Sequence, residues 1–207
     1  MNEIRILIVE DEPVIAKNIS MYLDNNDFTV SGIAYDDAEA KYELQFNTPD
    51  AVILDINLES PENGIDIARL INEKYRLPFI FLTSYADRET LENAKQVAPS
   101  GYIVKPFNEK TLLATMEIAI ANFASQHNRQ DPALQLQKIN RHLLSQLSER
   151  EFEVLKYMYN GNTNNQMAGA LFISVNTIKA HIKNAYLKID ANSRASAIWR
   201  LRELMKK

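Results

Sequence analysis

The sequence contains no cysteine among its 207 residues, which excludes disulfide bonds and thiolate metal sites. Proteins of the reducing cytoplasm commonly lack disulfides. No uninterrupted apolar stretch approaches the roughly 18 residues that a membrane-spanning helix needs. The start of the chain leads directly into an apolar run, without the charged and apolar regions of a signal peptide. We therefore expect a cytoplasmic protein without a membrane partner.

Acidic residues are scarce in the second part of the chain. Residues 1–124 contain 10 Lys and Arg against 21 Asp and Glu, a net charge of −11, whereas residues 125–207 contain 13 against 6, a net charge of +7. Such an asymmetry is typical of two domains with different partners. A small basic domain suits a polyanion such as double-stranded DNA, and solubility alone is the alternative explanation of the charge.

The first part of the chain alternates apolar runs with segments of helix length. The expected strands are 4–9, 28–33, 51–54, 78–82 and 101–104, and the expected helices are 13–24, 37–46, 64–75, 87–96 and 108–122. This alternation predicts a doubly wound α/β fold around a parallel sheet. With the strand order 2-1-3-4-5, a ligand would bind at the carboxyl ends of the first and third strands.

Five polar residues stand directly after the apolar runs: Glu10, Asp11, Asp55, Thr83 and Lys105. The carboxyl ends of parallel strands lie at one edge of the sheet, so we expect these side chains to meet there. Each residue taken alone could be a solvated side chain or a helix cap. Together, three carboxylates, a hydroxyl and an amine suit a divalent cation plus a phosphoryl group.

The chemistry that this set favours is phosphoryl transfer. Asp55 can attack a phosphoryl donor and form an aspartyl phosphate. Repulsion among three carboxylates favours a bound cation, and Mg²⁺, which prefers oxygen ligands, is the expected cofactor. Thr83 can hydrogen-bond one phosphoryl oxygen, and Lys105 can neutralise another.

With these residues, and with Pro106 directly after Lys105, residues 1–124 resemble a bacterial two-component receiver domain. The resemblance implies a flavodoxin-like (βα)5 fold, Asp55 as the phosphoacceptor and a sensor histidine kinase as the phosphoryl donor. The implied Mg²⁺ ligands are Asp11, Asp55, the backbone carbonyl of Asn57 and, through a water molecule, Glu10. In the family the peptide bond before this proline is often cis.

Tyr102 lies three residues before Lys105, where the family has its aromatic switch residue; a tyrosine that only fills the core is the alternative. Two departures from the family pattern concern the mouth of the site. The proline common four residues after the phosphoacceptor is delayed to Pro61, which predicts a longer loop. Ser84 replaces the usual Ala or Gly, and the bulky Tyr85 follows it. Both changes leave the chemistry of the site intact but are expected to affect how long the phosphoryl group stays on Asp55.

The second part of the chain begins with polar residues 123–134, which predict a linker. Four apolar residues then recur at helical spacing and predict a connecting helix: Leu136, Ile139, Leu143 and Leu147. Four short helices are expected beyond them, the first opened by a capping-box pattern of Ser148 and Glu151. The second and third, near 164–171 and 175–189, are joined by a tight turn and suggest a helix-turn-helix.

The helix predicted at 175–189 has two different faces. Its apolar stripe contains Ile178, Ile182, Ala185 and Ile189. The opposite face contains Asn176, Lys179, Ala180 and Lys183. Amide and lysine side chains can read base edges in a major groove, and the solvated face of a helical bundle is the alternative. His181 lies near the stripe and is expected to pack or orient, not to bind a metal.

The sequence from Leu147 to Leu204 resembles the LuxR-type helix-turn-helix. The resemblance is carried in order by Leu147-Ser148, Arg150-Glu151, Glu153-Val154-Leu155, Gly161, Asn164, Ala168, Leu171, Ile173-Ser174, Thr177-Ile178-Lys179, His181, Asn184, Lys188 and Arg194-Ala195. The expected DNA-binding residues are Asn164, Asn176, Thr177, Lys179, Ala180, Lys183 and Lys188. The last helix is expected to support a homodimer through a patch of Ala195, Ile198, Trp199, Leu201 and Leu204. Asn165 and Gln166 replace the family's usual Lys and Glu, which removes one phosphate contact and one ion pair.

Together the two resemblances predict a receiver domain at 1–124, a partly helical linker at 125–144 and a DNA-binding domain at 145–207. This organisation is that of a NarL/FixJ-type response regulator, a non-enzymatic protein in which phosphorylation of Asp55 controls DNA binding and transcription. One alternative is a receiver whose output is protein binding. Another is an aspartyl-phosphate phosphatase, which would need a general acid two residues after the nucleophile, where Asn57 stands.

Overall fold

The computed structural model describes residues 3–25, 27–84, 88–128 and 133–206. Contacts within the chain divide it into two compact units, of which the first is Ile4–Ile120 and the second contains the chain from Ala121 onwards. Among the described residues, no helix is both long and apolar enough to cross a bilayer.

The first unit is built on one parallel sheet of five strands in the order β2-β1-β3-β4-β5, as predicted. The strands are β1 (Ile4–Val9), β2 (Phe28–Ala34), β3 (Ala51–Asp55), β4 (Phe79–Thr83) and β5 (Gly101–Val104). Every residue of β3 and β4 is buried, which explains why both strands are apolar up to their last, polar residue.

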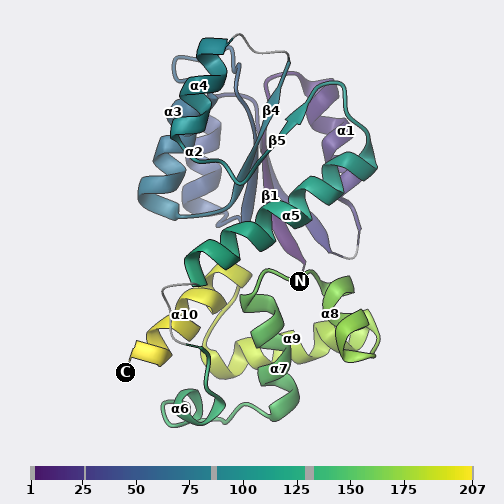
Figure 1. Cartoon of the computed structure of the whole chain (residues 1–207), viewed down its shortest axis with the longest axis vertical. Coiled ribbons are helices and arrows are strands. Elements are labelled where there is room, and N and C mark those ends of the chain that lie inside the picture. Colours follow the sequence, from purple (N-terminus) through teal and green to yellow (C-terminus); the bar gives the residue numbers. More distant parts are fainter. Residues whose placement is uncertain (1–2, 26, 85–87, 129–132, 207) are drawn as a thin grey trace. The chain divides into compact units, whose positions relative to one another are not determined.

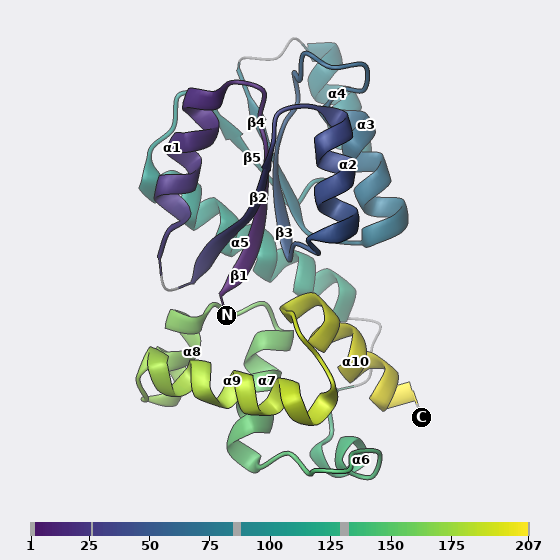
Figure 2. The same ribbon diagram turned by 180° about the vertical axis from the view of Figure 1, so that it is seen from behind.

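Helices cover both faces of this sheet, with α1 and α5 on one face and α2, α3 and α4 on the other (Figures 1 and 2). They are α1 (Pro13–Leu23), α2 (Asp37–Phe46), α3 (Gly64–Leu70), α4 (Arg88–Gln96) and α5 (Glu109–Asn128). On the first face, Ile8 and Ile53 of the sheet, Ile19 of α1, and Leu112 and Met116 of α5 belong to one buried cluster. The architecture is the predicted doubly wound α/β fold.

Two helices differ from the expected ranges. The segment after Leu70, expected to complete one helix, forms a π-helix, η1 (Ile71–Tyr75), and Arg76 ends it in the left-handed conformation with φ 54°. Helix α5, expected to end at residue 122, continues to Asn128. Burial explains its extension, because Ala124 lies on the buried side one turn beyond Ile120.

The second unit is helical. Its elements are α6 (Leu136–Asn140), α7 (Glu149–Tyr159), α8 (Asn164–Leu171), α9 (Val175–Ile189) and α10 (Arg194–Lys206). Its apolar core takes side chains from each of these helices, including Ile139, Leu155, Met167, Ile182 and Leu201. The predicted capping box at the start of α7 is present, with Ser148 accepting from the Glu151 N–H and Glu151 accepting from the Ser148 N–H.

The connecting helix predicted from Leu136 to Leu147 was wrong in length, because α6 ends at Asn140. The Asn140 side chain accepts a hydrogen bond from the N–H of Leu147 and donates one to its carbonyl, at 2.8 and 3.1 Å. Asparagine commonly competes with helix in this way. Leu147 is buried, so the apolar spacing here reports contact with the core and not a continuous helix.

The turn between α8 and α9 contains a strained residue. Phe172 ends α8 in the left-handed conformation with φ 56°, and it is 94% exposed. This conformation costs a residue with a side chain about 1 kcal/mol relative to glycine. An exposed phenylalanine gains little packing to offset that cost.

We therefore expect Phe172→Gly to be about 1 kcal/mol more stable than Phe172→Ala. Both variants lose the ring, so their difference isolates the backbone. Urea denaturation followed by the fluorescence of Trp199, the single tryptophan, reports on this unit. A Phe172→Gly variant less stable than Phe172→Ala would contradict the assigned backbone conformation.

Candidate functional site

The five polar residues singled out in the sequence lie at the carboxyl edge of the sheet. Asp55 and Thr83 are the last residues of β3 and β4, while Glu10 and Lys105 directly follow β1 and β5. Because β1, β3 and β4 are neighbours, their ends lie side by side. Asp11 follows Glu10 and leads into α1, which begins at a proline.

Among the described residues, Glu10 and Asp55 have the most deeply buried carboxylates, and Lys105 joins them. Its Nζ atom lies 2.6 Å from Asp55 Oδ2 and 2.7 Å from Glu10 Oε2. Glu10 is 0% and Asp55 4% exposed. Burial raises the pKa of Glu10 to about 7, and the nearby Asp55 charge also raises it, while the hydrogen bond from Lys105 acts in the opposite direction. Hydrogen bonds and charge from both carboxylates raise the pKa of Lys105, although burial alone would lower it. The peptide bond between Lys105 and Pro106 is cis.

Glu10, Asp11 and Asp55 can together hold a metal ion. One carboxylate oxygen of each lies within 4.8 Å of those of the other two. Three carboxylates at this spacing form an oxygen-rich site for a hard cation. Asp11 and Asp55 border a pocket of about 510 Å³ whose wall also includes Asn57 and Lys105.

Thr83 places a hydroxyl group in the same region. The side chain is buried, and its Oγ1 atom has no hydrogen-bond partner among the described residues. Buried hydroxyls are normally paired, so this one is suited to a ligand oxygen. Tyr102 of β5 is 37% exposed and packs its ring 5.9 Å from that of Phe81. Burial raises the pKa of the Tyr102 hydroxyl.

Gly64, which sequence reasoning missed, makes the site compact. It begins α3, and a methyl group in place of its hydrogen would lie 1.9 Å from the carbonyl oxygen of Asp55. Only glycine allows α3 to start this close to the end of β3. The Asn-Gly pair at 63–64 signals a turn in the sequence, but it does not reveal which backbone the turn approaches.

The departures at the mouth of the site lie in two loops. Ile56–Asn63 joins β3 to α3 and contains the delayed Pro61, and Asn57 of this loop is exposed. Ser84 is exposed and lines the pocket. Tyr85, the bulky residue of the second departure, lies outside the described residues.

In the second unit, the predicted apolar stripe of α9 is confirmed. Ile178, Ile182, Ala185 and Ile189 are buried, together with Tyr186. On the other side, Asn176, Thr177, Ala180 and Lys183 are exposed. Ser174 caps the helix by accepting a hydrogen bond from the Thr177 N–H at 3.1 Å. This N-terminal end of α9 presents small and polar side chains to solvent. His181, beside the stripe, is half-buried.

Three of the residues expected to bind DNA are buried or paired with a carboxylate in this structure. Asn164 is 0% exposed, so its side chain has no access to a ligand in this structure. Lys188 Nζ lies 2.7 Å from Glu151 Oε2, and this pair ties α9 to the start of α7. Lys179 is partly buried, with its Nζ atom 2.6 Å from Glu3 Oε1.

Only part of the patch expected on α10 is exposed to solvent. Leu201 and Leu204 are buried in the core of their own unit, so including them in a symmetric patch was wrong. Both lie on the buried stripe of α10, the helix that packs against α6 and α9. Trp199 is 61% exposed, and Ile198 is half-buried.

Two stabilising contacts of the second unit were missed. Thr163 and Gln166 form a second capping box, which the Thr-x-x-Gln spacing could have revealed. Arg194 is buried and donates from Nη2 to the carbonyls of Met158 and Asn162 at 2.8 and 2.7 Å. No sequence signal indicates that an arginine will bind the end of α7.

Two protein families match the two units. The family described as "Response regulator receiver domain" matches residues 6–117, and "Bacterial regulatory proteins, luxR family" matches residues 145–201. The first match contains the acidic cluster, and the second contains α7, α8 and α9.

Known proteins resemble either most of the chain or its receiver domain. The transcriptional regulatory protein YdfI of Bacillus subtilis is 28% identical over 200 residues, which are 94% of this chain and 93% of that protein. The signal receiver domain of a modulated diguanylate cyclase from Desulfovibrio desulfuricans is 32% identical, with a TM-score of 0.57, over 60% of this chain and 99% of that one.

Full-length FixJ from B. japonicum shares the fold, with a TM-score of 0.53 at 21% identity over 100% of this chain and 98% of that one. The receiver match covers more than half of the chain, and the LuxR-family match follows it. The chain therefore belongs to the NarL/FixJ-type response regulators, DNA-binding regulators of transcription that combine a receiver domain with a LuxR-type helix-turn-helix domain.

Proposed function

We propose that Asp55 accepts a phosphoryl group from a sensor histidine kinase and that this phosphorylation controls DNA binding by the second domain. We assign residues 1–124 to the receiver domain, 125–144 to the linker and 145–207 to the DNA-binding domain. The observation that carries the assignment of Asp55 is its surroundings: a buried carboxylate with an ammonium group at 2.6 Å and the hydroxyl of Thr83 at the end of the adjacent strand.

In the proposed transfer, a carboxylate oxygen of Asp55 forms a new bond to phosphorus. The bond from phosphorus to the imidazole nitrogen of the donor breaks, and that nitrogen keeps the electron pair. Lys105 then pairs with one phosphoryl oxygen, and the Thr83 hydroxyl donates to another. Lys105 needs to move little for this, because it already lies beside Asp55.

The acidic cluster fits Mg²⁺, which we propose as the cofactor. Its ligands would be Asp11, Asp55 and the carbonyl of Asn57, with Glu10 contributing through water. Bound Mg²⁺ would neutralise charge on the phosphoryl oxygens during transfer. We propose no phosphatase turnover, because the amide of Asn57 cannot serve as a general acid.

The proposed output is a change in the population of a DNA-competent form. The acyl phosphate carries a charge of nearly −2 where the Asp55 carboxylate carried −1, and it draws Thr83 and Tyr102 towards a new arrangement. The active form is proposed to be a homodimer in which Trp199 and Ile198 contribute to the contact between copies. DNA as the partner supports a location in the cytoplasm.

The DNA face that we propose is the exposed side of α9. Asn176, Thr177, Ala180 and Lys183 form it, with Lys179 at its border. Asn164 is left out because it is buried. Lys188 is left out because it pairs with the buried Glu151 at the start of α7. Lys179 also pairs with a carboxylate, that of Glu3, and is kept because it lies one helical turn from Lys183. The small Ala180 lets the helix approach the base edges of a major groove closely.

We expect Asp55→Asn to abolish labelling by radioactive acetyl phosphate in Mg²⁺, because an amide is not a nucleophile towards phosphorus. Labelling is measured on the intact chain after denaturing electrophoresis. Asp24→Asn, a change at an exposed aspartate that follows α1, is the control and should label like the parent. Equal labelling of Asp55→Asn and the parent would contradict the assignment.

For the DNA face, we expect Lys183→Ala to weaken binding to DNA selected from a random pool. If Lys183 contacts a phosphate, the slope of log affinity against log salt falls by about one. Fluorescence anisotropy at several salt concentrations measures both quantities. Lys206→Ala, which removes an exposed lysine from the end of α10, is the matched control. If Lys183→Ala binds like the control at every salt concentration, Lys183 is not part of the DNA face.

A further inference from the structure

The loop between β3 and α3 is bonded to the acidic cluster through its backbone. The N–H of Glu59 donates to Asp11 Oδ2 at 3.1 Å, and the N–H of Asn57 donates to Asp55 Oδ1 at 3.0 Å. Two of the three carboxylates in the cluster are thus oriented by the same loop. Asp11 belongs to the turn after β1, so its bond to Glu59 links segments 48 residues apart.

The contact with Asp11 requires a residue other than proline at position 59. Proline has no N–H to donate, so any residue except proline can make this bond. The proline of this loop comes two residues later, at Pro61. The delay of the proline therefore has a structural result: it leaves an amide N–H directed at a carboxylate of the cluster.

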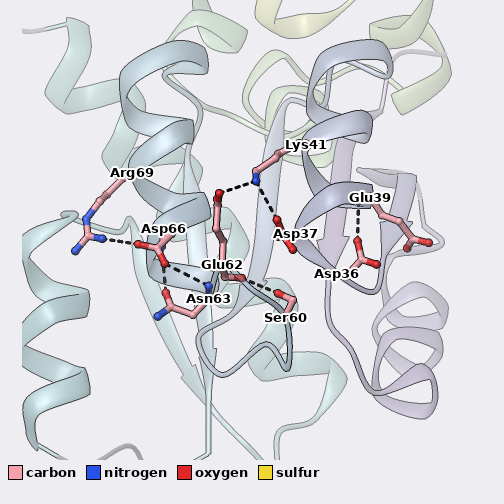
Figure 3. A network of polar contacts seen from close by, with 9 residues as sticks. All are labelled: Asp36, Asp37, Glu39, Lys41, Ser60, Glu62, Asn63, Asp66 and Arg69. Carbon is pink, nitrogen blue, oxygen red and sulfur yellow. Dashed lines mark hydrogen bonds and ion pairs between the residues drawn. The ribbon is translucent and has the colours of Figure 1, made fainter.

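The far end of the loop is attached to α2 (Figure 3). Lys41 of α2 lies 2.8 Å from Glu62 Oε1 and 2.9 Å from Asp37 Oδ2. Within the loop, the Ser60 hydroxyl donates to the Glu62 carbonyl at 2.6 Å. Lys41 of α2 thus pairs with Glu62, and Glu62 is hydrogen-bonded to Ser60. Ser60 directly follows Glu59 in the chain, so these contacts hold the loop beside the Glu59 N–H.

A second attachment lies where the loop enters α3 (Figure 3). Asn63 caps this helix by accepting from the Asp66 N–H, and Asp66 accepts from the Asn63 N–H in return. Arg69 pairs with Asp66 at 2.6 Å. The loop therefore has fixed ends at β3 and α3 and a side attachment at Lys41.

We propose that the Glu59 N–H is a positioning group for Asp11 and that the Lys41–Glu62 ion pair keeps it in place. This inference rests on the proposed function, in which Asp11 is a ligand of Mg²⁺. The hydrogen bond fixes the direction of the Asp11 carboxylate, so less ordering is needed when a cation binds. Groups that hydrogen-bond metal ligands commonly change metal affinity by about tenfold or more.

The two parts of the proposal differ in expected size. The bond from Glu59 acts directly on Asp11, whose side chain is only half-buried. The Lys41–Glu62 pair acts indirectly, and its two side chains are 38% and 45% exposed. Exposed ion pairs contribute little to stability, so we expect a smaller effect from Lys41.

The test compares Glu59→Pro with Glu59→Ala in the full chain. Both variants lack the Glu59 carboxylate, which lines the pocket, and only Glu59→Pro also lacks the N–H. Titration calorimetry with Mg²⁺ alone should show about tenfold weaker binding by Glu59→Pro than by Glu59→Ala. Equal affinities of the two folded variants would overturn the proposal.

Lys41 provides a second measurement that decides the matter if Glu59→Pro does not fold. Lys41→Met should bind Mg²⁺ about threefold more weakly than the parent. Lys41→Arg, which keeps the charge, should restore the parent's affinity. Lys95→Met is the matched control, because it breaks the exposed Lys95–Glu92 pair of α4. If Lys41→Met binds Mg²⁺ as tightly as Lys95→Met does, the Lys41 part of the proposal is wrong. If, in addition, Glu59→Pro does not fold, this result overturns the whole proposal.

The parent chain separates this inference from the proposed function. A parent that neither binds Mg²⁺ nor is phosphorylated on Asp55 would overturn both. A parent that does both, with Glu59→Pro equal to Glu59→Ala, would overturn only the role of the Glu59 N–H.

Discussion

The neutralisation of buried carboxylates by Lys105 is the constraint on which the receiver domain depends. Glu10 and Asp55 have almost no contact with solvent, and one ammonium group lies within 2.7 Å of both. A buried carboxylate without a partner costs several kcal/mol, so this edge of the sheet needs positive charge from some source. Lys105 supplies one charge, and burial still raises the pKa of Glu10 to about 7. An added cation is therefore the natural partner of the site.

This balance also explains how a small chemical change can reach the DNA-binding domain. In the proposed function, phosphorylation replaces the carboxylate of Asp55 with a group of greater charge, and Lys105 and Thr83 are the side chains placed to respond. Tyr102 lies on β5, the strand that Lys105 directly follows, and packs against Phe81 of β4. In the proposed account, the phosphoryl group stabilises one arrangement of these residues over another. The LuxR-type domain contributes a preformed helix, α9, whose buried stripe keeps its exposed face in a fixed orientation.

Local pattern was enough to predict the strands and the meeting of the five polar residues, because apolar runs mark strands and parallel strands share an edge. The strand order came from the doubly wound fold class and not from local pattern. The same logic failed for Leu136–Leu147, where apolar spacing arose from burial while Asn140 closed a turn. It also failed to separate the buried Leu201 and Asn164 from exposed neighbours, since that depends on packing between helices. The contacts of Gly64 and of the Glu59 N–H could not be predicted. Both are backbone approaches between separate segments, and backbone groups are the same in every residue type.

The most direct test of the account measures the affinity of the full chain for selected DNA before and after phosphorylation by acetyl phosphate, in the parent and in Asp55→Asn. Coupling between two sites in one protein is typically 1–3 kcal/mol. The account predicts that the phosphorylated parent binds about tenfold more tightly than the unphosphorylated parent. It also predicts that Asp55→Asn shows the same affinity with and without acetyl phosphate. Unchanged affinity in a fully phosphorylated parent would contradict the claim that Asp55 controls DNA binding.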